Sequence, residues 1–64
     1  MPTIHVELWE GRPLAARKQL IEELTETTTR VLGCSKASVQ VILNEVKKEN
    51  WGMGGELCSE KFPD

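Results

Sequence analysis

Two short runs of alternating apolar residues enclose one amphipathic stretch, and this order constrains the fold more than any other sequence feature. In residues 3–9, Ile4, Val6 and Leu8 alternate with other side chains, as is typical of a half-buried strand. Residues 39–46 are rich in β-branched side chains and predict a second strand. A strand, a crossover helix and a second strand form a parallel β-α-β unit, and such crossovers are almost always right-handed.

The intervening stretch carries signals for both ends of a helix. Pro13 suits the first helical position, because the N–H that proline lacks would have no partner there. Gly33 is suited to the left-handed conformation that commonly follows the last helical turn. Between them, apolar or weakly polar residues recur every three or four positions and predict a helix with one apolar face: Ala16, Leu20, Ile21, Leu24, Thr28, Val31 and Leu32.

The C-terminal part is predicted to form a tight hairpin. Three of the four residues 52–55 are glycines, which permit the backbone conformations that short turns require. A short tail ending at Phe62, Pro63 and Asp64 follows. Because no repeat or linker is visible, we expect residues 1–64 to form a single α/β (α+β) domain, a β-α-β unit with a C-terminal hairpin.

A domain this small needs additional stabilisation. A chain of 64 residues buries only about 60% of the surface that its unfolded form exposes. Cys34, Cys58 and His5 match no zinc-binding spacing, so we expect no metal. No signal peptide precedes the first predicted strand, which favours a cytoplasmic protein with free thiols. Two strands under one helix leave edges exposed, so we expect other subunits to extend the sheet.

Charge and hydropathy exclude two classes of partner. Eight basic and ten acidic residues give a net charge of −2 without a basic stripe, so we expect no nucleic-acid partner. No run approaches the ~18 apolar residues that cross a bilayer, so we expect no membrane span. Lys47 and Lys48 are predicted to be solvated, and His5 and Glu45 to be surface or interface residues.

Pro2 offers unusual chemistry. A small second residue normally permits removal of Met1, which would expose a secondary amine at Pro2. The ordinary pKa of an α-amino group is about 7.7–8.0, and an apolar site or a nearby cation favours the neutral form. A neutral amine can act as a general base at neutral pH. While Met1 is attached, the Pro2 nitrogen is an amide and cannot do so.

Several features of the chain occur together in one known family. They are the N-terminal Pro2, a turn at Glu10-Gly11-Arg12, a strand start at Ser38-Val39 and the hairpin of residues 51–56. Over essentially its whole length the chain thus resembles the 4-oxalocrotonate tautomerase (2-hydroxymuconate tautomerase) family. The resemblance implies a cofactor-independent isomerase of aromatic hydrocarbon catabolism, acting on a small carboxylate-bearing enol or keto acid. It also implies a homohexamer, a trimer of dimers.

The resemblance also implies roles for individual residues. Pro2 would take a proton from one position of a dienol acid and return it at another. Arg12 would bind a substrate carboxylate in a neighbouring subunit, for which a guanidinium is well suited. Trp51 stands where relatives typically carry phenylalanine, and would make the pocket apolar. Trp9 is predicted to contribute packing or a pocket wall.

One position departs from the family pattern. The second strand of relatives carries an arginine that polarises the substrate keto oxygen, and this chain has Gln40 there. Our leading hypothesis is a slower or differently selective tautomerase, for mono-acids or enol pyruvates, in which Gln40 is a neutral donor. The alternative is a heterohexamer whose partner chain supplies the arginine. A dehalogenase or decarboxylase ranks lower, because residues 52–54 offer no water-activating carboxylate before Glu56.

Overall fold

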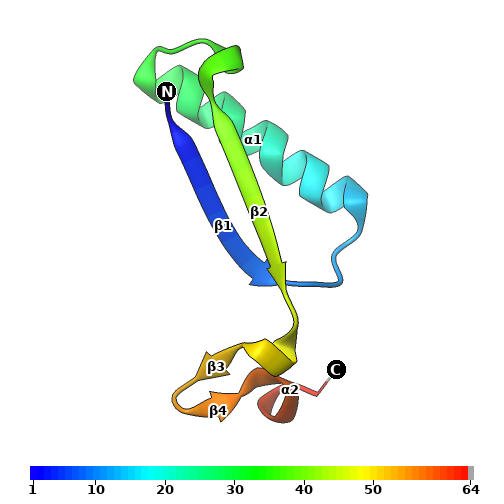
Figure 1. Ribbon diagram of the computed structural model, residues 1–64. Coiled ribbons are helices and arrows are strands. Elements are labelled where there is room, and N and C mark those ends of the chain that lie inside the picture. Colours follow the sequence, from blue (N-terminus) through cyan, green and yellow to red (C-terminus); the bar gives the residue numbers. More distant parts are fainter. Residues whose placement is uncertain (64) are drawn as a thin grey trace.

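A parallel strand pair and one helix form the larger part of the molecule. In the computed structural model, which describes residues 1–63, β1 (Thr3–Trp9) is followed by α1 (Leu14–Leu32) and β2 (Gln40–Val46). The strands lie side by side from the Thr3–Gln40 pair to the Trp9–Val46 pair, with α1 across one face (Figure 1). The predicted parallel β-α-β unit is therefore confirmed.

The two ends of α1 follow the predicted signals. Pro13 is the N-cap residue, and the helix begins at Leu14, one residue later than predicted. The Pro13 carbonyl accepts hydrogen bonds from the N–H groups of Ala16 and Arg17. Gly33 has a φ of 69°, and its N–H donates to the Thr29 carbonyl at 2.9 Å. A side chain at Gly33 would strain this left-handed conformation, so glycine ends the helix without that cost.

The C-terminal part is a second, smaller unit below the sheet (Figure 1). Two short 3-10 turns, Lys36–Ser38 (η1) and Lys48–Asn50 (η2), precede and follow β2. The predicted hairpin is confirmed as β3 (Gly52–Met53) paired antiparallel with β4 (Glu56–Leu57). The predicted tail instead begins with a helical turn, α2 (Cys58–Lys61).

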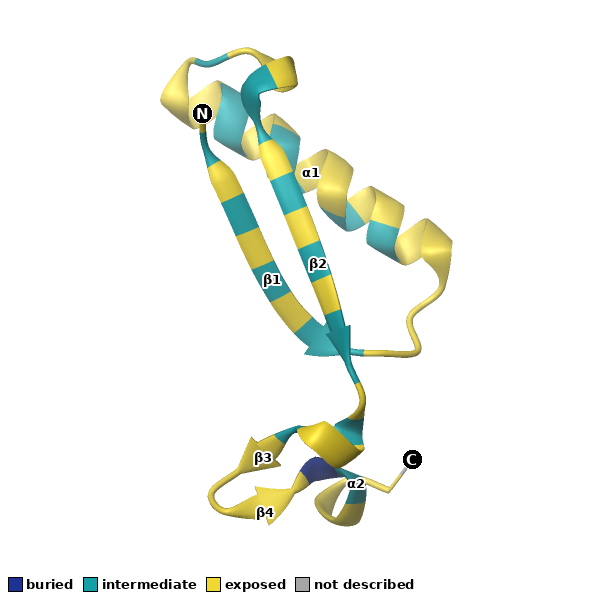
Figure 2. Ribbon diagram, in the orientation of Figure 1, coloured by how far each residue is buried: buried dark blue, intermediate teal, exposed yellow. Residues whose placement is uncertain are grey.

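Burial alternates along both strands, as the sequence pattern predicts (Figure 2). The half-buried positions of β1 and β2 alternate with exposed ones, which line the opposite face of the sheet: Thr3, His5, Glu7, Gln40, Ile42 and Asn44. Cys58 is the one fully buried residue among residues 1–63. On α1, the predicted apolar face is incompletely covered, since Val31 and Leu32 are 66% and 63% exposed.

The chain is too thin to enclose a core of its own. Its extents are 43 × 24 × 13 Å and its radius of gyration is 14.7 Å, against about 11 Å for a compact domain of this length. It exposes 4872 Å², whereas a compact monomer of 7.2 kDa exposes about 4,100 Å². An excess of this kind is typical of a chain that buries surface against other subunits. No helix in the described part of the chain is long and apolar enough to cross a membrane.

Candidate functional site

Pro2 and Gln40 meet at the end of the sheet where both strands begin. The N–H of Gln40 donates to the Pro2 carbonyl at 3.0 Å, directly before the Thr3–Gln40 register pair. Pro2 is half-buried, whereas the Gln40 side chain is on the exposed sheet face. Two of the four predicted site residues are therefore neighbours within one chain.

Arg12 lies at the other end of the strands. It belongs to the loop between β1 and α1, where Gly11 has a φ of 116° that favours glycine. The Arg12 guanidinium donates one hydrogen bond, from Nη1 to the Trp9 carbonyl at 3.2 Å. Since a guanidinium has five N–H donors, most of them are available for a planar anion such as a carboxylate.

A surface hollow of about 700 Å³ surrounds Arg12. It is lined by residues from the β1–α1 loop, the end of β2 and the C-terminal unit: Trp9, Glu10, Gly11, Arg12, Lys47, Lys48, Glu49, Ser59 and Pro63. Three of these side chains are cationic and two are anionic. The hollow is thus large enough for a small organic acid and has a cationic excess that attracts one.

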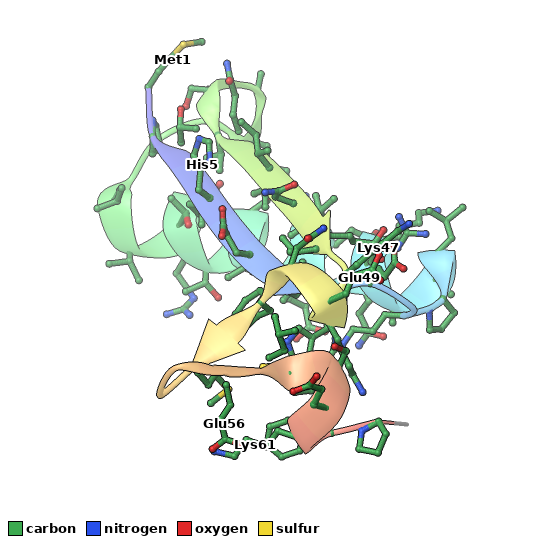
Figure 3. The ribbon with its side chains drawn as sticks, turned by 60° about the horizontal axis from the view of Figure 1, so that its bottom comes forward. Met1, His5, Lys47, Glu49, Glu56 and Lys61 are labelled. Carbon is green, nitrogen blue, oxygen red and sulfur yellow. The ribbon has the colours of Figure 1, made fainter. Side chains whose placement is uncertain are left out.

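The two groups of predicted site residues are far apart within one chain. Met1 and His5 lie at one end of the sheet, and Lys47 and Glu49 lie at the other (Figure 3). β1 has seven residues, and at a rise of roughly 3.3 Å each it separates Pro2 from the Arg12 loop by about 23 Å. A small substrate cannot touch both residues of the same chain.

An aromatic cluster joins the strand end to the C-terminal unit. Trp9 packs edge-on against Trp51 with ring centroids 6.3 Å apart, and its centroid lies 5.5 Å from that of Phe62. Trp9, predicted as packing or pocket wall, lines the hollow. Trp51 contacts Trp9 and is not among the residues that line this hollow.

Lys48 is not the solvated residue that the sequence predicted. It is half-buried, its Nζ lies 4.9 Å from the centroid of the Trp9 ring, and it donates to the Phe62 carbonyl at 2.8 Å. Lys47 does match the prediction, because it is exposed and its Nζ is 4.0 Å from a carboxylate oxygen of Glu49. No sequence signal distinguishes the two lysines, since the difference arises from the position of Phe62.

Comparisons with known proteins agree with this architecture. The family model described as tautomerase enzyme matches residues 2–61. The chain belongs to the tautomerase family. A 2-hydroxymuconate tautomerase of Pseudomonas putida is 38% identical over 60 residues, which cover 94% of this chain and 95% of that protein. The predicted family is thereby confirmed, and tautomerases are isomerases.

Two solved structures of tautomerase homologues have the same fold. A 4-oxalocrotonate tautomerase homologue is 42% identical with a TM-score of 0.89, and covers 94% of this chain and 95% of its own. TomN, a 4-oxalocrotonate tautomerase homologue in the tomaymycin biosynthetic pathway, is 35% identical with a TM-score of 0.93. That alignment covers 98% of this chain and 97% of TomN. The fold of this tautomerase is therefore that of the family from β1 through the hairpin.

The two neighbouring lysines give a matched test of the aromatic cluster. We expect Lys48→Ala to lower the free energy of unfolding by about 1–2 kcal/mol, because it removes a charged hydrogen bond and a cation–π contact. Lys47→Ala should change it by less than about 0.5 kcal/mol. Urea titrations followed by tryptophan fluorescence, at one protein concentration, measure both. Equal effects of the two substitutions would contradict the assigned contacts.

Proposed function

We propose that this tautomerase, after removal of Met1, interconverts the enol and keto forms of a small 2-hydroxydienoate or 2-oxo acid. The amine of Pro2 takes a proton from the hydroxyl or a carbon of the substrate and returns it to another carbon, so that a double bond moves. No electrons are transferred to or from the substrate, and we propose that the reaction needs no cofactor. The observation that carries the proposal is the family match, which begins at Pro2.

The hollow around Arg12 supports an acidic substrate. Arg12 would bind the carboxylate remote from the reacting carbons in a bidentate manner, which fixes the orientation of the chain of double bonds. Trp9 supplies an apolar wall beside this guanidinium. We propose that Trp51 supports that wall from behind, and thus contributes to the apolar character of the pocket.

The distance between Pro2 and Arg12 supports a site shared by two chains. Because about 23 Å separates them along one strand, the Arg12 next to a given Pro2 must come from another copy. The thin, incompletely buried chain supports association as well. We propose a homohexamer, a trimer of dimers, of a cytoplasmic enzyme that acts in aromatic hydrocarbon catabolism.

Gln40 modifies this function. A side-chain amide can donate to the substrate carbonyl, but hydrogen bonds between neutral groups contribute about 0.5–1.5 kcal/mol against about 1.5–3 for those to charged groups. We therefore propose a slower tautomerase than a relative with arginine at this position. The same substitution favours, as a second candidate, a heterohexamer in which a partner chain supplies that arginine.

Replacing the secondary amine should strongly lower turnover. After Met1 is removed, Pro2→Ala leaves a primary amine without the proline ring, and we expect it to lower kcat for the ketonisation of 2-hydroxymuconate by at least about 100-fold, because general acid–base catalysis by a well-positioned amine contributes that much or more. Ultraviolet absorbance follows the reaction, and the intact mass establishes whether Met1 is absent. Protein that retains Met1 is the matched control, and should be inactive because its Pro2 nitrogen is an amide. Undiminished turnover by either form would overturn the role of Pro2.

Restoring the missing charge should increase the rate. We expect Gln40→Arg to raise kcat/KM for 2-hydroxymuconate about tenfold, the effect of strengthening one hydrogen bond by roughly 1.4 kcal/mol. Gln19→Arg adds the same charge at an exposed position of α1 and should leave kcat/KM unchanged. If Gln40→Arg gives no increase, Gln40 does not contact the substrate.

Two inactive chains should complement each other. We expect an equal mixture of Pro2→Ala and Arg12→Ala chains, unfolded together and refolded, to recover roughly a quarter of the wild-type activity. In a random assembly, about a quarter of the shared sites combine an intact Pro2 from one chain with an intact Arg12 from another. Each variant refolded alone is the control. A site formed within one chain would give no recovery in the mixture.

A further inference from the structure

The segment that carries Arg12 is held by side chains rather than by the sheet or the helix. The strand ladder extends as far as Glu10, whose N–H donates to the Val46 carbonyl at 3.0 Å. The helix begins to accept hydrogen bonds at the Pro13 carbonyl. Gly11 and Arg12 lie between these two anchors, and regular secondary structure therefore does not determine their position.

Glu45 holds the first of these two residues. It is half-buried near the end of β2, on the strand positions that alternate with the exposed face. Its two carboxylate oxygens have different partners: Oε2 accepts the N–H of Gly11 at 3.3 Å, and Oε1 lies 3.1 Å from Nη1 of Arg17. Gly11 has a φ of 116°, which is one of several backbone conformations open to glycine. The hydrogen bond from its N–H to Glu45 stabilises this conformation relative to the others.

Arg17 holds the second residue. From the first turns of α1, its Nε donates to the Arg12 carbonyl at 3.3 Å, while Nη1 pairs with Glu45. The side chains of Arg17 and Glu45 are only 32% and 27% exposed, so solvent screens their pairing less than it would at a fully open surface. One ion pair, formed between helix and strand, thus contacts the backbone on both sides of the Arg12 side chain.

We propose that Arg17 and Glu45 are positioning residues for Arg12. By fixing the Gly11 N–H and the Arg12 carbonyl, they hold the Arg12 side chain at the hollow and set how well it binds the remote carboxylate of a dicarboxylic substrate. This inference rests on the proposed function, in which Arg12 binds that carboxylate. Neither residue touches the substrate, and each acts through the loop.

Binding of an unreactive dicarboxylate tests this role without any turnover. The probe is muconate, which has two carboxylates and no enol, and its neutral dimethyl ester is the matching ligand without a carboxylate. By calorimetry we expect Arg17→Ala to raise the Kd of muconate about tenfold and to leave that of the dimethyl ester unchanged. Glu45→Gln, which is nearly isosteric and keeps one acceptor oxygen, should act in the same direction but less strongly. Lys18→Ala, a neighbouring exposed residue on α1, is the control.

A double-mutant cycle separates positioning from general stabilisation. In an Arg12→Ala background, Arg17→Ala should cause no further loss of muconate affinity, because the group that it positions is already absent. Light scattering checks that every variant assembles as the wild type does. Arg17→Ala removes a helix–strand contact and can therefore impair assembly. If that variant does not assemble, the muconate affinities of the milder Arg17→Lys and Glu45→Gln variants are measured instead.

Several results would overturn the proposal. Muconate affinity that is unchanged in Arg17→Ala, equal weakening of muconate and its dimethyl ester, or additive losses in the double variant would each show that the pair only joins helix to strand. Wild-type protein that binds muconate no better than Arg12→Ala would remove the role of Arg12 itself. The dependence of enol turnover on Pro2 is measured separately, so failure of the catalytic proposal is distinguishable from failure of this one.

Discussion

The parallel pairing of β1 with β2 is the constraint on which the rest of the structure depends. Both strands begin at the same end, so the residues before them meet, and both end together, so the loops after them meet. Pro2 and Gln40 therefore share one end, whereas Arg12 and Lys48 share the other. α1 covers one face of the pair, and the opposite sheet face is left exposed. The parallel pairing therefore explains both why the predicted site residues lie at two ends of the sheet and why the chain needs further copies to cover its open face.

Periodicity predicts most of this fold because local burial decides it. The alternation in residues 3–9 and the spacing along residues 14–32 reflect which side chains face a neighbouring layer, whereas the glycines of the hairpin reflect the backbone conformations of its turn. The observed elements agree with all three signals. The helical turn of residues 58–61 was not predicted, since four residues are too few to show a period.

The candidate site could be predicted less completely. Their chemistry and the family resemblance indicate Pro2, Arg12 and Gln40 as site residues, but the sequence does not indicate that they lie far apart within one chain. The contact of Glu45 with Arg17 joins residues 28 positions apart, and that of Lys48 with Phe62 spans 14. Such pairs depend on how the loop and the C-terminal unit pack, for which single-sequence patterns carry no signal. This is also why two adjacent lysines, Lys47 and Lys48, have such different surroundings.

The thinness of the chain also affects how the enzyme forms. A plate 13 Å thick, with a single fully buried residue among residues 1–63, has almost no interior to collapse around. In the proposed assembly, most apolar surface leaves water only when copies meet, so collapse of the chain and its association become a single event. The rate at which active enzyme appears then rises more steeply than in proportion to the number of chains, and newly synthesised copies depend on one another to fold.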